Sequence, residues 1–325
     1  MAEKTFNWFP GHMLKGKRII SENLSRVDAL IELVDSRVPL ASLNHDLYSS
    51  SNKSARAPRR ILVLNKCDLA EKEKTTRWVE LFRRYGVPAM GADSLSGASG
   101  INRLIRELQK IHEIKKDDAR RGAITSTLHV MVVGLPNVGK SSLINRLSSH
   151  KGQEPGATPR KGKARTGASP GVTRGGQWLK VAKGLEILDT PGVLFPRMSS
   201  RAQGVKLALI AAITDRVLDE ESVAEALLTY LASVRPEILT EKFGLQLPEG
   251  IVLGWEKDDT IRFGQNMLRE LSIRLGKFHR GGDIDTLSGA IGLLSEFRKG
   301  GLGRITLESP EDFPTEMLQQ LIVHG

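Results

Sequence analysis

Residues 134–141 read Gly-Leu-Pro-Asn-Val-Gly-Lys-Ser and directly follow the apolar run at 128–133. This stretch fits the pattern GxxxxGKS, in which backbone N–H groups surround phosphate and glycine is needed because a Cβ would block the approach. A helical pattern over residues 141–147 comes next. A strand, a glycine-rich turn and a helix in that order predict a phosphate-binding loop within an α/β fold.

The residue types in this loop suggest distinct roles. We expect Lys140 to reach the β- and γ-phosphates of a nucleotide and Ser141 to place its hydroxyl on Mg²⁺. The following helix directs its positive end at the phosphates. The loop residues predicted to contact the nucleotide are Gly134, Pro136, Asn137, Val138, Gly139, Lys140, Ser141 and Ser142.

A second motif for phosphate chemistry lies at residues 189–192, which read Asp-Thr-Pro-Gly and follow a short apolar run. Alone this tetrapeptide is a common turn, but together with the phosphate loop it becomes specific. Asp189 fits a carboxylate that acts on Mg²⁺ through water, and Gly192 fits a backbone N–H donor to the γ-phosphate. Thr173, in Pro-Gly-Val-Thr-Arg, is the candidate switch threonine that completes the Mg²⁺ shell, with a solvated loop threonine as the alternative.

The tetrapeptide at residues 65–68, Asn-Lys-Cys-Asp, follows another apolar run. An ionised Asp68 only accepts hydrogen bonds, so it pairs with the N1–H and 2-amino donors of guanine, a donor pair that adenine lacks. We expect Asn65 to tie the base to the phosphate loop, the Lys66 stem to cover a face of the base, and Ser94 to lie in a loop that contacts guanine. Combined with the two phosphate motifs, the tetrapeptide predicts a site for GTP rather than ATP.

Length and charge bound the number of domains and the class of partner. The 325 residues suggest about two domains, and a hydrophobic content of 40% is enough for packed cores. The formal net charge of +11 favours a polyanionic partner such as nucleic acid, with a basic surface on an ordinary enzyme as the alternative.

The single cysteine, Cys67, excludes an intrachain disulfide and is typical of a reducing compartment. No apolar run approaches the roughly 18 residues of a membrane span, so we expect no membrane partner.

Apolar runs alternate with helical patterns through the first 200 residues, which predicts an α/β fold with a mostly parallel sheet. After that point the pattern becomes helical, so a smaller α-helical domain is expected. Residues 115–127 read as a hydrophilic connector and residues 310–321 as a capped peripheral segment. Residues 151–176 form a Gly/Pro-rich loop with six lysines or arginines against one glutamate. Strands are expected at 29–34, 61–64, 87–90, 128–133 and 185–188, and a helix at 101–115.

The order of the motifs is the unusual feature of the chain. The tetrapeptide at 65–68 precedes the motifs at 134–141 and 189–192, whereas ordinary regulatory GTPases carry the phosphate loop first. This order resembles that of circularly permuted GTPases. With Trp-Phe-Pro-Gly-His-Met at 8–13 and Asp-Ser-Arg-Val-Pro at 35–39, the chain resembles the ribosome biogenesis GTPase A family. The resemblance is dense over residues 8–195 and rests on position and pattern in the helical region.

Pattern and resemblance together predict a circularly permuted P-loop GTPase domain at 1–200, a linker at 201–215 and an α-helical RNA- or ribosome-binding domain at 216–325. The resemblance implies a GTP hydrolase that assists assembly of the large ribosomal subunit. We further expect a monomer in the bacterial cytoplasm, stimulation by that subunit, and rRNA binding controlled by nucleotide state. The alternative is a GTP/GDP-switched RNA-binding adaptor with negligible hydrolysis. The adaptor stays open because Val193 occupies a position where many GTPases carry the glutamine that orients water.

The resemblance also supplies candidates for the hydrolysis step. His12 is the candidate group that orients water or accepts its proton; the alternative is that its segment packs or contacts RNA. Asn137 resembles the asparagine of potassium-stimulated GTPases that helps to bind K⁺, with an asparagine favoured by turn geometry as the alternative. Asp35 and Arg37 have no chemical assignment from their spacing, and we expect them to form a structural ion pair or to support the permuted loop.

Overall fold

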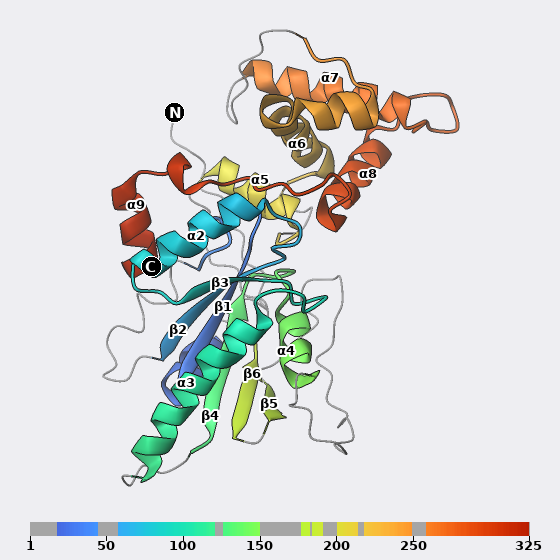
Figure 1. The fold of residues 1–325 in the computed structure, drawn as a ribbon. Coiled ribbons are helices and arrows are strands. Elements are labelled where there is room, and N and C mark those ends of the chain that lie inside the picture. The colour runs from blue at the N-terminus through green and yellow to red at the C-terminus, as the bar shows by residue number, and fades with distance from the viewer. Residues whose placement is uncertain are drawn as a thin grey trace. The chain divides into compact units, whose positions relative to one another are not determined.

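The computed structural model divides into two compact units (Figure 1). The first contains the described residues up to Thr190 together with those from Ile305 onward, and the second contains those between Ser200 and Arg304. The model describes residues 18–44, 58–120, 126–149, 177–182, 184–190, 200–213, 218–248 and 258–324.

A sheet of six described strands forms the centre of the first unit, in the order β3-β2-β1-β4-β6-β5. The strands β1, β2, β3, β4 and β6 run parallel, and β5 is antiparallel to β6. The predicted mostly parallel sheet is therefore confirmed. The sequence did not predict β5. The strands are β1 (Ala29–Asp35), β2 (Arg59–Asn65), β3 (Ala89–Ala92), β4 (Leu128–Gly134), β5 (Gln177–Ala182) and β6 (Leu185–Asp189).

The chain leaves the centre of this sheet in two directions. After β1 it continues to β2 and β3 at one edge, and after β4, the parallel neighbour of β1, it continues to β5 and β6 on the other side. Such a reversal in an α/β sheet opens a crevice beyond the carboxyl ends of the two central strands, where ligands bind. The motifs at 35–39, 65–68, 134–141 and 189–192 begin at the ends of β1, β2, β4 and β6. The fold therefore collects them along one edge.

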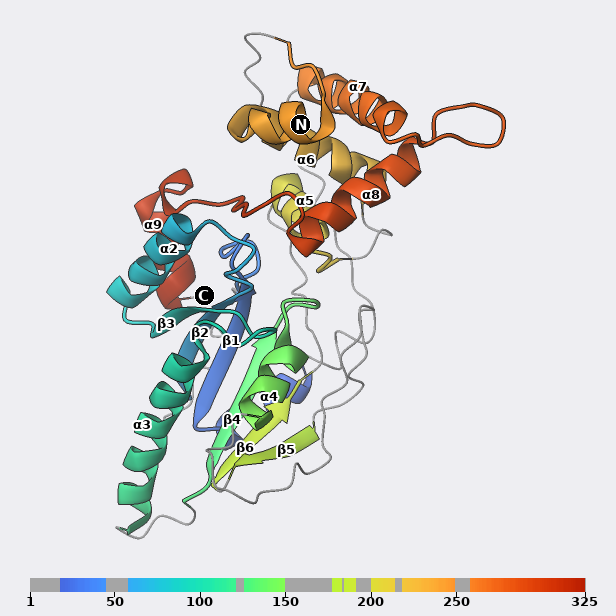
Figure 2. The same ribbon diagram turned by 45° about the vertical axis from the view of Figure 1, so that its right-hand side comes forward.

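Helices cover both faces of the sheet (Figure 2). On one face, Trp78 and Phe82 of α2 (Lys72–Arg84) pack in a cluster with Leu62 and Leu64 of β2. On the other face lie α3 (Ile101–Arg120) and α4 (Lys140–Ser149), whose buried residues include Leu104 and Leu143. Residues 18–23 are helical and lead into the 3-10 turn η1 (Leu24–Arg26).

Two local expectations for this unit are wrong. The predicted connector at 115–127 is helical as far as Arg120, and the Lys116–Glu113 ion pair of 2.7 Å lies within this last part of α3. The C-terminal segment is not peripheral, because Leu318 of α9 (Thr315–Gln319) and Ile322 of η4 (Gln320–His324) are 4% and 1% exposed in the α2 cluster. Ahead of them, the predicted cap is present: Ser309 and Asp312 form a capping box at η3 (Pro310–Asp312).

The second unit is helical. Asp219 and Asp285 begin α6 and α8 by accepting hydrogen bonds from backbone N–H groups, as helix-capping aspartates do. The helices cross closely at Gly289, where a Cβ would lie 2.0 Å from Ser272 Oγ. Across the described residues, no helix is both long enough and apolar enough to cross a bilayer. The unit contains α5 (Arg201–Leu209), α6 (Glu220–Val234), the π-helical turn η2 (Ile238–Lys242), α7 (Asp258–Arg274) and α8 (Thr286–Lys299).

The observed unit boundaries differ from the predicted linker at 201–215 and helical domain at 216–325. Helix α5 occupies most of the predicted linker and belongs to the helical unit, while residues from Ile305 onward belong to the unit with the sheet. The reason is burial, because Leu318 and Ile322 complete the apolar cluster under α2.

Candidate nucleotide-binding site

Two glycines shape the phosphate loop between β4 and α4. A Cβ on Gly134, whose φ is +155°, would lie 2.5 Å from the Leu33 carbonyl oxygen of the neighbouring strand. A Cβ on Gly139, whose φ is +102°, would lie 2.2 Å from Asn65 Nδ2. Pro136 and Val138 are buried between them. Glycine is therefore favoured at Gly134 by the contact with backbone, and at Gly139 by its φ together with the contact with the Asn65 amide, in addition to any contact with phosphate.

Asn137 has a φ of +61°, in the left-handed region that asparagine adopts more readily than most residues. This conformation supports the turn-geometry interpretation of Asn137, and its proposed role in K⁺ binding stays a prediction.

Lys140 and Asp189 are two buried charged residues of this site. Lys140 Nζ donates to the carbonyl oxygens of Gly134 and Leu135, at 3.1 and 2.8 Å. Burial lowers the pKa of Lys140 to about 8, against the opposing charge of Asp189. Burial likewise raises the pKa of Asp189, against the opposing charge of Lys140. The lysine is thus placed beside the phosphate loop with a charge that is costly to keep buried, which an anionic ligand would stabilise.

Asn65 joins the phosphate loop to the loop that follows β3. Its Nδ2 donates to the Val138 carbonyl oxygen at 2.7 Å, and its Oδ1 accepts from the Ser94 backbone N–H at 3.1 Å. Asp93, which the sequence analysis did not single out, accepts hydrogen bonds from the backbone N–H groups of Leu95 and Ser96, both at 3.0 Å. The site residues at the ends of β2, β3 and β4 are therefore brought together by one amide side chain.

A buried ion-pair network lies beside the tetrapeptide 65–68. Arg37 donates to both carboxylate oxygens of Asp35, at 2.9 and 2.8 Å, and Lys66 Nζ lies 3.0 Å from Asp35 Oδ2. Desolvation opposes ionisation of Asp35, but the charges of Arg37 and Lys66 and the hydrogen bonds from Arg37 outweigh it and hold its pKa well below the usual range. Burial opposes the charge of Arg37, but the charge and hydrogen bonds of Asp35, with a smaller effect from the exposed Asp68, outweigh it and raise the pKa of Arg37. The expected ion pair is confirmed.

The donor set at the end of β6 fits Mg²⁺. Asp189 Oδ1 is buried and has no hydrogen-bond partner among the described residues, and Ser141 supplies a hydroxyl in the first turn of α4. Carboxylate and hydroxyl oxygens are the ligands that Mg²⁺ prefers. Thr173 and Gly192, predicted to complete this region, lie outside the described residues, as do His12 and the Gly/Pro-rich stretch at 151–176.

The return segment, residues 305–308, carries contacts that the sequence analysis missed. The buried Glu308 carboxylate accepts hydrogen bonds from the backbone of the loop after Asp35, including one of 2.7 Å from Leu40 N–H. The segment contains no motif, and its partners lie more than 200 residues earlier in the chain. No local pattern would have indicated it.

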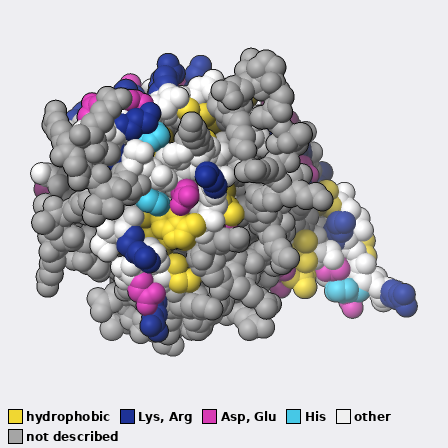
Figure 3. Space-filling view, turned by 90° about the horizontal axis from the view of Figure 1, so that it is seen from below, with side chains coloured by type: hydrophobic (Ala, Val, Ile, Leu, Met, Phe, Trp, Pro, Cys, Tyr) yellow, Lys and Arg dark blue, Asp and Glu magenta, His cyan; other side chains and the backbone are white. Residues whose placement is uncertain are grey.

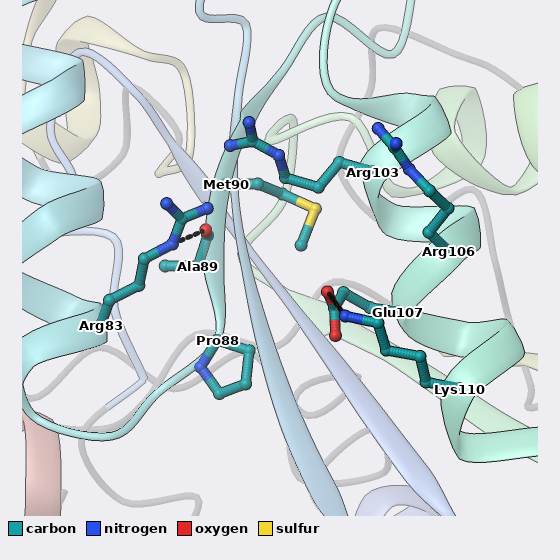
Figure 4. Close-up of a pocket in the computed structure, with 8 residues that line it drawn as sticks. All are labelled: Arg83, Pro88, Ala89, Met90, Arg103, Arg106, Glu107 and Lys110. Carbon is teal, nitrogen blue, oxygen red and sulfur yellow. Dashed lines mark hydrogen bonds and ion pairs between the residues drawn. The ribbon is translucent and has the colours of Figure 1, made fainter.

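A basic groove of about 440 Å³ lies between α2, β3 and α3, away from these motifs (Figure 4). Arg83 Nε donates to the Ala89 carbonyl oxygen at 2.9 Å, and Lys110 pairs with Glu107 at 2.9 Å. The Arg103 side chain extends over the strand toward Arg83. The residues that line the groove are Arg83, Pro88, Ala89, Met90, Arg103, Arg106, Glu107 and Lys110.

The permuted sheet and the motifs at its carboxyl edge define a circularly permuted P-loop GTPase. A family described as 50S ribosome-binding GTPase matches residues 129–240. Ribosome biogenesis GTPase A of Bacillus cereus is 36% identical over 308 residues, which span 94% of each chain. The protein of the same name from Priestia megaterium is 35% identical over 95% of this chain and 98% of its own.

The solved structure of GNP-bound YlqF from T. maritima has a TM-score of 0.57, with 22% identity over 91% of this chain and 99% of that one. The fold is thus shared along nearly the whole length. The chain belongs to the ribosome biogenesis GTPase A family.

Proposed function

We propose that the protein binds GTP with Mg²⁺ at the carboxyl edge of the sheet, hydrolyses it, and acts in maturation of the large ribosomal subunit, with nucleotide state setting its affinity for rRNA. The observation that carries the choice of nucleotide is the Asn65 bridge. Its two hydrogen bonds, to Val138 and Ser94, place the tetrapeptide 65–68 beside the phosphate loop. A single nucleotide can therefore place its base at Asp68 and its phosphates at Lys140.

The chemistry assigns separate tasks to the residues of the site. The phosphate loop and Lys140 bind and orient the β- and γ-phosphates, and Asp68 selects guanine by accepting two hydrogen bonds. Asp189 and Ser141, with Thr173 as the candidate third ligand, would hold Mg²⁺, which supplies positive charge to the phosphates when bound. Val193 cannot orient water, so His12 is the candidate for that task. A His12→Ala variant should keep its GTP affinity and lose turnover; unchanged turnover would remove His12 from the mechanism.

The basic groove is the RNA-contacting surface that we propose for the GTPase unit. Four cationic side chains line it against the single carboxylate Glu107, which is already paired with Lys110. On the face seen in Figure 3, the described Lys and Arg side chains are instead interspersed with Asp and Glu. Concentrated arginine guanidinium groups fit the phosphate oxygens of an RNA backbone. Basic side chains also discourage pairing between exposed edge strands, so an RNA-binding measurement is needed to test the proposal.

One set of measurements tests the proposed function. Titration of the purified protein with GTP and ATP should show binding of GTP only, and equal binding of both nucleotides would contradict the site assignment. Sedimentation with large ribosomal subunits across salt concentrations should differ between GDP and a non-hydrolysable GTP analogue. Stimulation of GTP turnover by added subunits distinguishes the hydrolase from the adaptor alternative, which predicts nucleotide-dependent binding without stimulated turnover.

A further inference from the structure

The return segment makes a reciprocal set of hydrogen bonds with the loop that follows the tetrapeptide 65–68. Ile305 N–H donates to the Leu69 carbonyl oxygen at 3.1 Å. Thr306 Oγ1 accepts from the Glu71 backbone N–H at 2.9 Å, and Thr306 N–H donates back to Glu71 Oε2 at 3.1 Å. The chain on the carboxyl side of Asp68 is therefore fixed within three residues of that side chain.

The same segment holds the loop that follows β1. Leu307 N–H donates to the Arg37 carbonyl oxygen at 2.8 Å. The Glu308 carboxylate accepts from Leu40 N–H at 2.7 Å and from Ala41 N–H at 3.1 Å. The guanidinium of Arg37 pairs with Asp35. The return segment therefore also holds the backbone that carries this ion pair.

Burial makes these contacts costly to lose. Thr306 is fully buried and Glu308 is 2% exposed. A buried carboxylate is tolerated only where hydrogen bonds or charges compensate its desolvation, and removing a partner leaves the rest of the set unsatisfied. Residues 305–308 therefore specify one backbone arrangement for the loop after the tetrapeptide 65–68 and for the loop after β1.

We propose that the return segment positions the guanine-recognition loop, and that Thr306 and Glu308 are positioning residues for selectivity toward guanine. Thr306 acts on the backbone that follows Asp68. Glu308 acts through the loop that carries Asp35 and Arg37, which in turn holds Lys66. This inference rests on the proposed assignment of Asp68 to guanine, and it adds residues from the far end of the chain to that site.

The comparison of GTP with inosine triphosphate isolates this role. Inosine keeps the N1–H donor of guanine and lacks its 2-amino group, so it forms one hydrogen bond to Asp68 where guanine forms two. If Asp68 is displaced, GTP loses more affinity than inosine triphosphate, and the ratio of the two affinities falls. A variant that only lowers the stability of the folded protein leaves that ratio unchanged, because both ligands bind the same folded molecules.

The test uses the full chain with Thr306→Val and Glu308→Gln as separate variants, after thermal unfolding has shown that each is folded. We expect the preference for GTP over inosine triphosphate to fall about fivefold or more in each. Turnover of saturating GTP should change less than twofold, since the phosphate loop is not altered. Two matched controls should keep the wild-type preference: Thr306→Ser, which retains the hydroxyl, and Glu311→Gln, which alters an exposed carboxylate close by.

An unchanged preference in the folded Thr306→Val and Glu308→Gln variants overturns the inference. If one variant does not fold, the other decides. The wild-type measurement separates this failure from that of the proposed function. A wild-type protein that prefers GTP while its variants keep the same preference refutes only the positioning role, whereas a wild-type protein without a preference for GTP refutes the guanine site itself.

Discussion

Gly139 of the phosphate loop packs so closely against Asn65 of the guanine tetrapeptide that a Cβ on Gly139 would lie 2.2 Å from Asn65 Nδ2. The hydrogen bond from Asn65 to the Val138 carbonyl oxygen lies immediately beside this contact. The base-binding and phosphate-binding parts of the site are thus interlocked rather than independent.

Gly139→Ala should disrupt the packing between the base-binding and phosphate-binding parts of the site. The new Cβ displaces the Asn65 amide and also strains the backbone at a φ of +102°, so GTP affinity should fall at least tenfold, or about 1.4 kcal/mol. Equilibrium binding of a fluorescent guanine nucleotide measures the change. Gly86→Ala is the control, because Gly86 has a φ of +80° with nothing within 4 Å of an added Cβ. Equal losses in both variants would show that the contact with Asn65 is unimportant.

Nucleotide binding should take up a proton at alkaline pH. The pKa of Lys140 is lowered to about 8, and bound phosphates raise it again because they stabilise the charged form. Binding at pH 9 should therefore take up about 0.9 of a proton, and affinity should fall as the pH rises above 8. Calorimetry in two buffers with different ionisation enthalpies measures the uptake.

Cys67→Ser provides the control for this titration, since burial raises the pKa of the Cys67 thiol and the variant should show the same uptake as the wild type. An uptake near zero at pH 9 in both proteins would show that Lys140 is fully charged before the nucleotide arrives.

Asp68→Asn should change the preferred base. An amide side chain offers a donor where the carboxylate only accepts, so it pairs with the 2-carbonyl of xanthine and leaves a donor of guanine unpaired. GTP affinity should fall by about 10- to 100-fold while affinity for xanthosine triphosphate rises. Competition binding with both nucleotides measures the exchange. A variant that loses affinity for both equally would place Asp68 away from the base.

Arg103→Gln should weaken binding to large subunits or their rRNA and reduce the slope of log affinity against log salt by about 1, as expected for one lost phosphate contact. Lys180→Gln removes one positive charge from the exposed side of β5, at the opposite edge of the sheet from the groove, and should change binding less. GTP affinity should stay at the wild-type value in both variants. Equal RNA binding by both would remove the groove from the proposal.

The sequence predicted those parts of the fold that rest on contiguous signals. Each motif follows an apolar run, so the strands before Asn65, Gly134 and Asp189 were placed within one or two residues. The reversed order of the motifs then indicated the permutation, and the resemblance to the ribosome biogenesis GTPase A family is confirmed. The alternation of strands and helices also predicted the parallel sheet, because apolar periodicity is a local property.

Contacts between distant single residues were beyond the reach of the sequence. Glu308 is an ordinary charged residue in Thr-Leu-Glu-Ser, and only the folded chain brings it to the backbone of Leu40. The sequence predicted that Asn65 ties the base to the phosphate loop, but not its close packing against Gly139, since the motif explains this glycine by phosphate alone. The predicted boundary of the helical domain was wrong for the same reason, because burial of Leu318 and Ile322 depends on α2.

The C-terminal residues from Ile305 onward give the chain a topology in which the helical unit is an insert rather than an appendage. Truncating the polypeptide between Thr190 and Ser200 removes Leu318 and Ile322 from the apolar interior under α2 as well as the helices. A minimal GTPase should therefore be engineered by excising residues 200–304 and joining the flanking ends. A stop codon near residue 200 would leave a protein with an exposed hydrophobic cavity.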